Sequence, residues 1–232
     1  MKTWETKNAY RITQLLSGRS NVFLLTNGAK NILVDTSTKY MWHLLKKRLQ
    51  QLNINHIDYL ILTHSHFDHA ANTCRIKEKY NARIIVHKDE ASCLASGVNF
   101  IPQGTNLYTR TIVNLLAKLF GAKIKSEPCK PDILVETKLD LNDFGFNAYI
   151  MHTPGHSPGS MSIIVDNEVA VVGDAMVGVL RWTVFPPFAD DVRLLINSWG
   201  RLLETNCTVF LPSHGSANKK PLVQKDYNKR KL

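Results

Sequence analysis

The chain has 232 residues, of which 44% are hydrophobic and 21% carry a charge. These are the proportions of an ordinary globular protein, and they exclude a chain that is disordered or fibrous throughout. No apolar run approaches the roughly 18 residues that a membrane-spanning helix needs. No apolar stretch follows the first charged residues either, so a secretory signal is not expected. We therefore predict a cytoplasmic protein without a membrane partner.

The formal net charge of +10 lies mainly in two segments. Residues 219–232 contain six basic side chains and one acidic side chain, and four further basic side chains lie between residues 39 and 48. The simpler interpretation is a solvated helix face and, at the end of the chain, a solvated basic tail over residues 219–232. The alternative is attraction of nucleic acid or of an anionic substrate.

Strands and helices are predicted in chain order from the spacing of apolar residues. Runs typical of strands occupy residues 10–16, 22–26, 32–34, 57–62, 83–86, 147–151, 161–165, 169–172 and 208–211. Helical spacing is found near residues 41–52, 70–80, 89–95 and 192–203. In each half of the chain strands come first and then alternate with helices, and no linker separates the halves. We therefore predict one domain over residues 1–218, with two β-rich halves packed together and helices outside.

Residues 97–131 interrupt this order. The segment is punctuated by Gly and Pro, and it contains an apolar stripe at helical spacing, formed by Ile112, Val113, Leu116, Leu119 and Phe120. We interpret it as an inserted helix. Such a stripe packs into the core or against a second copy of the chain, as in a homodimer, or it covers a binding pocket as a lid. If it is a lid, the facing wall could be formed by Trp182, Phe185 and Phe188.

The residues that indicate chemistry begin directly after the apolar run 57–62. Three histidines and one aspartate occur within six residues, at His64, His66, Asp68 and His69. Imidazole nitrogens and a carboxylate oxygen suit Zn²⁺ and its divalent neighbours. Four donors on one short loop would crowd a single ion, but they could serve two adjacent ions.

Three more potential ligands follow predicted strands, at His156, Asp174 and His214. His156 lies in the segment 153–160, where Pro and Gly on both sides hold an irregular backbone, as expected where a ligand must keep a set direction. Each of these three alone would be an ordinary loop residue. Together with the first cluster they predict a metal site.

The order of these motifs resembles that of the metallo-β-lactamase superfamily, over residues 22 to about 215. The resemblance implies an α+β fold, an αβ/βα sandwich in which helices flank two central mixed β-sheets and the metals lie at one edge between the sheets. Asp35 matches the first motif of the family and would orient the ligand loop through hydrogen bonds. The resemblance further implies two ions that share one carboxylate, the first held by His64, His66 and His156, the second by Asp68, His69 and His214, with Asp174 as the bridge.

These residues predict a metal-dependent hydrolase. Two cations that share a water would lower its pKa to near neutrality and supply hydroxide, while Asp68 would be the catalytic residue that orients this nucleophile and moves a proton to the leaving group. Zinc is the expected metal, with iron and manganese as alternatives. The segment 153–160 resembles family members that act on thioesters and lactones, such as glyoxalase II-like enzymes and lactonases. We therefore expect a small-molecule ester, thioester or lactone as substrate.

Two other activities stay open at this point. A phosphodiesterase or nuclease would use the same two metals together with the charge of +10, although nucleic acid is not the favoured partner. An iron-dependent sulfur dioxygenase would use a single iron, usually held by two histidines and one aspartate in such relatives. The presence of all of the following residues favours two metals over that alternative: His64, His66, Asp68, His69, Asp174 and His214.

Overall fold

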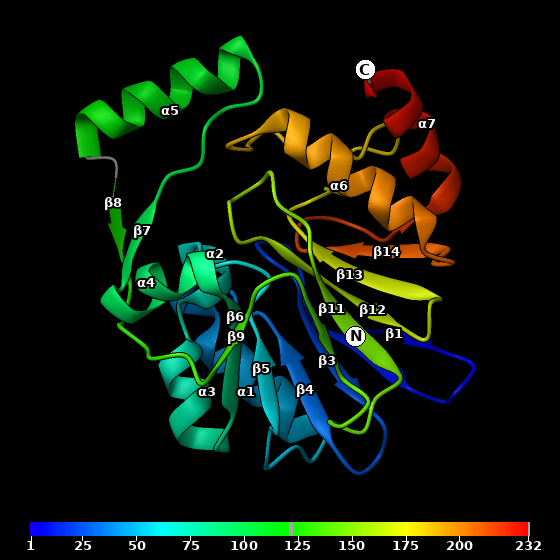
Figure 1. Cartoon of the computed structure of the whole chain (residues 1–232). Coiled ribbons are helices and arrows are strands. Elements are labelled where there is room, and N and C mark those ends of the chain that lie inside the picture. Colours follow the sequence, from blue (N-terminus) through cyan, green and yellow to red (C-terminus); the bar gives the residue numbers. More distant parts are fainter. Residues whose placement is uncertain (121–122, 232) are drawn as a thin grey trace.

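Two β-sheets pack face to face at the centre of the molecule, and helices cover the outer face of each sheet (Figure 1). The computed structural model describes residues 1–120 and 123–231. Within them, the first sheet has the strand order β1 (Lys2–Glu5), β2 (Arg11–Leu16), β3 (Val22–Thr26), β4 (Asn31–Val34), β5 (Tyr59–Ile61), β6 (Arg83–His87) and β9 (Ile133–Val135). The second has the order β10 (Lys138–Asp140), β11 (Ala148–His152), β12 (Met161–Val165), β13 (Val169–Gly173), β14 (Val209–Pro212) and β15 (Asn218–Lys219). A separate ribbon pairs β7 (Val98–Phe100) with β8 (Lys123–Lys125).

Both sheets are apolar on both faces, because each lies between the other sheet and a layer of helices. In β3, Phe23 and Leu25 pack into the core between the sheets, while Val22 and Leu24 pack against helices. The side chains of a strand alternate between the two faces of its sheet, so a continuous apolar run is what a central strand of this kind requires. Helices α1 (Trp42–Gln51), α3 (Thr73–Tyr80) and α4 (Lys88–Ser96) cover the first sheet, and α6 (Val192–Glu204) and α7 (Lys220–Arg230) cover the second. The predicted αβ/βα sandwich is confirmed.

Parallel pairing brings the loops that matter for function to one edge of the sandwich. Strands β4, β5 and β6 run parallel in the first sheet, and β13 and β14 run parallel in the second. The carboxyl ends of parallel strands meet at the same edge, so the loops after β4, β5, β13 and β14 lie close together. Helix α5 (Leu107–Phe120) extends beyond the sheets at this end of the molecule (Figure 1).

The end of the chain differs from the predicted solvated tail. It forms helix α7, which packs beside α6 and buries Val223 and Asp226. The Asp226 carboxylate accepts hydrogen bonds from the backbone N–H of Val184 at 2.7 Å and from the hydroxyl of Thr183 at 2.5 Å. These contacts hold the helix in place, and its basic side chains remain on the outside. The expectation of a solvated tail was wrong because charge alone does not reveal two buried positions one turn apart.

None of the helices in the described part of the chain combines the length and the apolar character that crossing a membrane requires.

Candidate metal centre

The seven predicted ligands meet at the edge of the sandwich where the two sheets adjoin. The loop after β5 and the short helix α2 (Phe67–Ala70) carry the first four of them. The other three follow β11, β13 and β14. Their potential ligand atoms lie within 4.8 Å of one another in three groups, namely His64–His66–His156, His64–His69–Asp174 and Asp68–His69–His214. We refer to these seven side chains as the site cluster.

Asp174 lies between the two ends of the site cluster. Its Oδ2 atom is 3.6 Å from Nε2 of His156, 3.7 Å from Nε2 of His69 and 3.3 Å from Nε2 of His214. Asp68 has a similar position at one end, because its Oδ2 atom is 3.3 Å from Nε2 of His214 and 3.5 Å from Nε2 of His69. The cluster therefore has two halves joined by a central carboxylate.

Acceptors outside the cluster determine which ring nitrogen each histidine presents. Nδ1 of His156 donates to the carbonyl of Phe188 at 3.0 Å, and Nδ1 of His214 donates to the carbonyl of Arg19 at 2.6 Å. In a neutral imidazole whose proton is on Nδ1, Nε2 is left with a free lone pair, which is the form that binds a metal. Both rings thus direct a metal-binding nitrogen into the cluster.

Asp35 forms hydrogen bonds to the ligand loops, as predicted. Its carboxylate accepts hydrogen bonds from the backbone N–H and the hydroxyl of Thr63, both at 2.8 Å, and from the hydroxyl of Ser213 at 3.1 Å. It also accepts from Nδ1 of His69 at 2.9 Å. Thr63 and Ser213 are the residues directly before two of the ligands, so a single carboxylate at the end of β4 ties the ends of β5 and β14 together.

Three buried polar atoms in the cluster have no hydrogen-bond partner among the described residues. They are Nε2 of His64, Nε2 of His69 and Oδ1 of Asp174. Leaving buried polar atoms unpaired is costly, and natural proteins do so rarely. A divalent cation would satisfy such lone pairs, so the residues present fit a metal site.

The charges of the cluster also suit cations. Burial alone would raise the pKa of Asp174, but His69 and His156 outweigh it and hold this pKa well below its usual range. Burial together with the adjacent imidazoles lowers the pKa of His64 well below its usual value, and burial and His156 lower the pKa of His66 to about 3. Burial opposes the charged form of His214, but its hydrogen bonds to the two carboxylates raise its pKa to about 10. At neutral pH the carboxylates are therefore ionised, and the imidazoles of His64 and His66 are neutral. Although burial opposes it, Asp68 and Asp174 also raise the pKa of His69 well above its usual value, so this part of the cluster favours positive charge.

Comparison with known proteins identifies the family. Residues 17–214 match the sequence profile described as the Metallo-beta-lactamase superfamily. The chain belongs to this superfamily. It is 34% identical to a "probable metallo-hydrolase" of Methanocaldococcus jannaschii, over 84% of this chain and 87% of that relative. It is 30% identical to the hydroxyacylglutathione hydrolase GloC of Haemophilus influenzae, over 74% of each chain.

A solved structure of the superfamily shows the same fold. The crystal structure of the BLEG-1 B3 metallo-beta-lactamase superposes with a TM-score of 0.71, covering 95% of this chain and 100% of that chain. At 21% sequence identity this similarity concerns the fold. The predicted family and architecture are thus confirmed, and the metal-dependent chemistry of the superfamily agrees with the donor set described above.

One buried carboxylate of this metallo-β-lactamase fold was missed by the sequence analysis. Glu90, in α4, is 4% exposed and accepts hydrogen bonds from the backbone N–H and the hydroxyl of Ser65. Its other oxygen accepts from the hydroxyl of Ser157 at 2.6 Å and from the backbone N–H of Gly159 at 3.1 Å. Ser65 and Ser157 are direct neighbours of ligands, so Glu90 joins two ligand loops. Acids are common in the first turn of a helix, and nothing in the sequence marks this one.

Four of the nine histidines lie outside the site cluster, and two of these, His87 and His152, lie side by side. The rings of His87 and His152 stack with their centroids 3.9 Å apart, and both residues lie close to Asp89. Nε2 of His87 donates to the carbonyl of Glu136 at 2.7 Å, and Nε2 of His152 donates to the carbonyl of Pro158 at 2.8 Å. Nδ1 of His87 accepts the backbone N–H of Asp89 and so caps helix α4. The protein itself occupies these nitrogens.

A cavity of about 520 Å³ opens onto the site cluster. Five of the seven predicted ligands lie in its wall, and the other lining residues are all apolar: Phe67, Ile101, Pro102, Ile112, Val113, Ile124, Val177, Val179, Pro186, Pro187 and Phe188. Among the lining residues there is no lysine or arginine. We refer to this space as the apolar cavity.

The contribution of α5 to the apolar cavity comes from Ile112 and Val113. The side chains of the other three residues of the predicted stripe, Leu116, Leu119 and Phe120, lie outside the described residues. On the opposite wall, Phe188 lines the cavity as predicted. Trp182 and Phe185 do not line it, which corrects the prediction: Trp182 is 67% exposed, and Phe185 packs edge-to-face on Trp199 beside α6.

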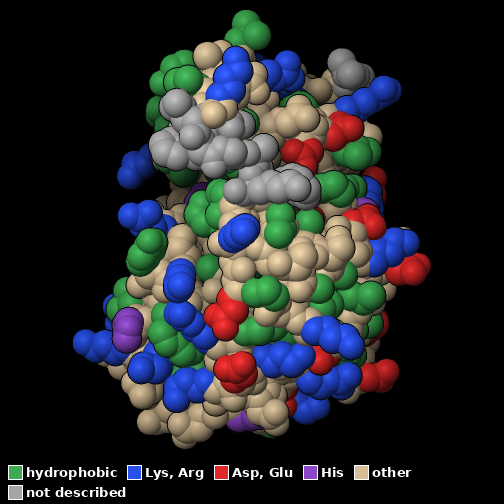
Figure 2. Space-filling model, turned by 90° about the vertical axis from the view of Figure 1, so that its left-hand side faces the viewer, with side chains coloured by type: hydrophobic (Ala, Val, Ile, Leu, Met, Phe, Trp, Pro, Cys, Tyr) green, Lys and Arg blue, Asp and Glu red, His purple; other side chains and the backbone are tan. Residues whose placement is uncertain are grey.

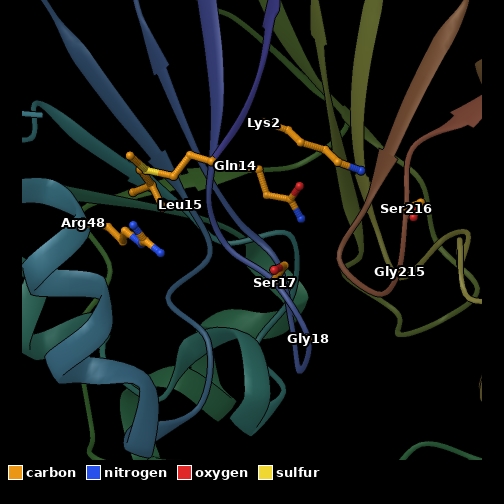
Figure 3. Close-up of a pocket in the computed structure, with 9 residues that line it drawn as sticks. Lys2, Gln14, Leu15, Ser17, Gly18, Arg48, Gly215 and Ser216 are labelled. Carbon is orange, nitrogen blue, oxygen red and sulfur yellow. The ribbon is translucent and has the colours of Figure 1, made fainter. Parts of the chain in front are cut away.

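A separate polar cleft of about 480 Å³ lies beside Gly215 and Ser216, the residues after His214. Figure 3 shows Arg48 on one side of this cleft and the Gly215–Ser216 loop on the other, with Lys2 and Gln14 between them. None of the predicted ligands lines it. It therefore has no direct access to the chemistry of the site cluster.

Proposed function

We propose that this metallo-hydrolase binds two divalent cations and hydrolyses a small ester, thioester or lactone whose acyl part is apolar. Two of the three ligand groups, His64–His66–His156 and Asp68–His69–His214, share no residue. Asp174 lies within 3.7 Å of histidines from both groups. This arrangement supports two ions with a shared carboxylate better than it supports one. Zinc suits this mixture of imidazole and carboxylate donors, as do iron and manganese.

The residues of the chain have distinct tasks in this reaction. When bound, two cations supply hydroxide at neutral pH and polarise the carbonyl oxygen of the substrate. Asp68 is 22% exposed at its side chain and lines the apolar cavity, so its carboxylate can reach the substrate and move a proton to the leaving group. Asp35 and Glu90 keep the ligand loops in place beneath it.

The apolar cavity is the observation that carries the choice of substrate. A nucleic acid brings a phosphate backbone, and proteins that bind it place Lys and Arg side chains along it. The wall around the site cluster has no such side chains among its lining residues. An acyl chain or a lactone ring fits this surface, and the relative from Haemophilus influenzae, named as a hydroxyacylglutathione hydrolase, acts on an acyl compound.

Metal analysis together with a substrate panel tests the proposal. The purified protein is loaded separately with Zn²⁺, Mn²⁺ or Fe²⁺. Turnover is then measured for three substrates: a hexanoyl thioester, a lactone with a six-carbon chain and bis(p-nitrophenyl) phosphate. We expect about two ions per chain and turnover of at least one acyl substrate. Turnover of the phosphodiester alone would favour the nuclease, and one iron per chain with oxidation of a sulfur compound would favour the dioxygenase.

A further inference from the structure

A second cavity, of about 740 Å³, adjoins the apolar cavity. The two share Phe67 and Ile124 as lining residues, so they are neighbours. Phe67 stands between two predicted ligands in the sequence and is 40% exposed. The remaining wall of the second cavity is formed by Arg19, Thr38, Lys39, Tyr40, Ala71, Lys125, Ser126 and Glu127. We refer to this space as the basic cavity.

The basic cavity differs from its neighbour in charge. It is lined by three cations, Arg19, Lys39 and Lys125, and by one acid, Glu127. Glu127 has its own partner, because its carboxylate lies 3.8 Å from Nε of Arg75. Within the described residues, no ion pair or side-chain hydrogen bond occupies the three cations, and the hydroxyl of Thr38 is buried without a partner. The face of the molecule that carries β7, β8 and α4 shows more basic than acidic side chains in Figure 2.

The walls of the basic cavity are tied to the site cluster by hydrogen bonds. The carbonyl of Arg19 is the acceptor that orients His214. The hydroxyl of the next residue, Ser20, donates to the carbonyl of Asp68. The side-chain amide of Asn72 donates to the carbonyl of Thr38 at 2.9 Å. The backbone at Arg19 and Thr38 is therefore linked to the segment that carries the ligands, so Arg19 and Lys39 project from chain segments that are connected to the site cluster.

Tyr40 adds a flat aromatic surface at the mouth of the basic cavity, where it is 89% exposed. An exposed aromatic ring next to free cations suits a ligand that has both anionic oxygens and an extended body. The apolar cavity does not suit anionic oxygens, because apart from the site cluster its lining side chains carry no hydrogen-bond donor.

We propose that the basic cavity binds an anionic leaving group of the substrate, while the acyl part occupies the apolar cavity. The inference rests on the proposed function and narrows it to an acyl thioester or ester whose thiol or alcohol part carries phosphate or carboxylate. In the reaction water adds to the acyl carbon and the bond from that carbon to sulfur or oxygen breaks. One proton of the water goes to the leaving sulfur or oxygen and the other goes to solvent. The products are a carboxylate and a thiol or alcohol that carries the phosphate or carboxylate. Phe67, shared by both cavities, would lie beside the scissile bond.

Three thioesters with the same hexanoyl group test this arrangement. Their thiols are N-acetylcysteamine, which is neutral, mercaptosuccinate, which carries carboxylates, and 4′-phosphopantetheine, which carries a phosphate. We expect a higher kcat/KM for the anionic thioesters, and the better of the two identifies the anion that the cavity prefers. Single variants Arg19→Gln, Lys39→Gln and Lys125→Gln should each reduce the ratio of kcat/KM between anionic and neutral thioesters by roughly 5-fold, as loss of one exposed charge pair predicts.

The matched control is Lys2→Gln, which removes a cation of the separate polar cleft and should leave that ratio unchanged. Binding gives a second readout that does not depend on turnover. By calorimetry, the uncleavable thioether S-hexyl-4′-phosphopantetheine should bind the metal-loaded protein more tightly than S-hexyl-N-acetylcysteamine, and the Lys39→Gln variant should reduce that difference.

The outcomes separate the two proposals. If no thioester is hydrolysed, the proposed function fails, and calorimetry still decides whether the basic cavity binds an anion. If all three thioesters are hydrolysed with equal kcat/KM and both thioethers bind equally, the anionic leaving group is wrong and the hydrolase stands. If the anionic thioesters are preferred but only Lys2→Gln reduces the preference, the anion lies in the other cleft and the assignment to the basic cavity is overturned.

Discussion

Two groups of histidines lie in the described part of this protein, and they differ in what their ring nitrogens contact. In the site cluster, Nδ1 of His156 and of His214 donates a hydrogen bond to a backbone carbonyl, and Nε2 faces Asp174. In the stacked pair, Nε2 of His87 and of His152 donates a hydrogen bond to a backbone carbonyl. Nδ1 of His87 accepts a backbone N–H at the N-terminus of α4. The ring nitrogens of the first group converge on one another and on the carboxylates, and the second group uses its nitrogens to support the fold.

The difference teaches that histidine content is a weak guide to a metal site. Asp89 lies close enough to His87 and His152 to form with them a group of three potential metal ligands. Yet two imidazole rings stacked 3.9 Å apart at an angle of 21° cannot both direct an in-plane lone pair at one ion. In the site cluster, the ring planes of His64 and His66 lie at 86° to each other and those of His69 and His214 at 79°, so these rings are not stacked and their in-plane lone pairs can meet.

The strongest test of this comparison removes one histidine from each group. His64 belongs to two of the three ligand groups of the site cluster, so His64→Ala should release metal. Loss of a residue that only orients a ligand lowers activity roughly 10- to 100-fold, and loss of the ligand His64 itself should lower turnover by more than that. His152→Ala is the matched control and should keep both metal content and rate. Elemental analysis and thioester turnover measure the two effects. Equal loss of metal in both variants would end the distinction between the groups.

The next largest effect separates the two aspartates that accompany the histidines. Asp68→Asn keeps the shape of the side chain but removes its charge and its capacity to accept a proton, so kcat should fall by roughly 100-fold or more. Asp89→Asn, beside the stacked pair and 3.5 Å from His87, serves as the control. Circular dichroism shows whether both variants fold. An unchanged kcat in folded Asp68→Asn would exclude the proposed proton transfer.

A smaller effect on metal binding is expected from Glu90, which holds the ligand loops in place without being a ligand itself. Glu90→Gln replaces two of the acceptor lone pairs that hold the loops around Ser65 and Ser157 with an amide N–H₂ group. Metal affinity should fall roughly 10- to 100-fold, the range for partners that orient ligands. Competition with a chelator of known affinity measures it. Glu136→Gln is the control, because its side chain is 73% exposed although its carbonyl supports His87. Equal metal affinities in the two variants would show that Glu90 supports the fold and not the metal.

The smallest effect concerns the apolar cavity, which opens onto one histidine group and not onto the other. Val113→Ala removes two methyl groups from its wall, so KM for a hexanoyl substrate should rise by about 3- to 10-fold. Leu115→Ala, on the same helix at a position that is 56% exposed, should leave KM unchanged. A lower melting temperature of Val113→Ala with unchanged KM would assign α5 to core or dimer packing instead of to a lid.

The sequence by itself determined which residues form the candidate metal site. His64, His66, Asp68 and His69 follow an apolar run that the structure shows as β5, and the later ligands follow runs that it shows as β11, β13 and β14. Apolar spacing is a local property that predicts where strands end, and the carboxyl ends of parallel strands share one edge. The central strands were therefore predicted nearly to the residue, as 161–165 illustrates. Short edge strands such as β1, β10 and β15 were missed, because few apolar residues mark a strand that is solvated on one side.

Only the tertiary structure decided which hydrogen bonds orient those residues and which cavities lie next to them. The acceptors that orient His156 and His214 are backbone carbonyls, which have no sequence signature, and Glu90 reaches its partners from a helix that is distant in the chain. The folding of the chain end as α7 likewise depends on contacts with α6. The proximity of the apolar and basic cavities depends on Phe67 and Ile124, which are far apart in the sequence. Such contacts join distant segments through geometry, whereas local patterns of residue type report only on neighbours along the chain.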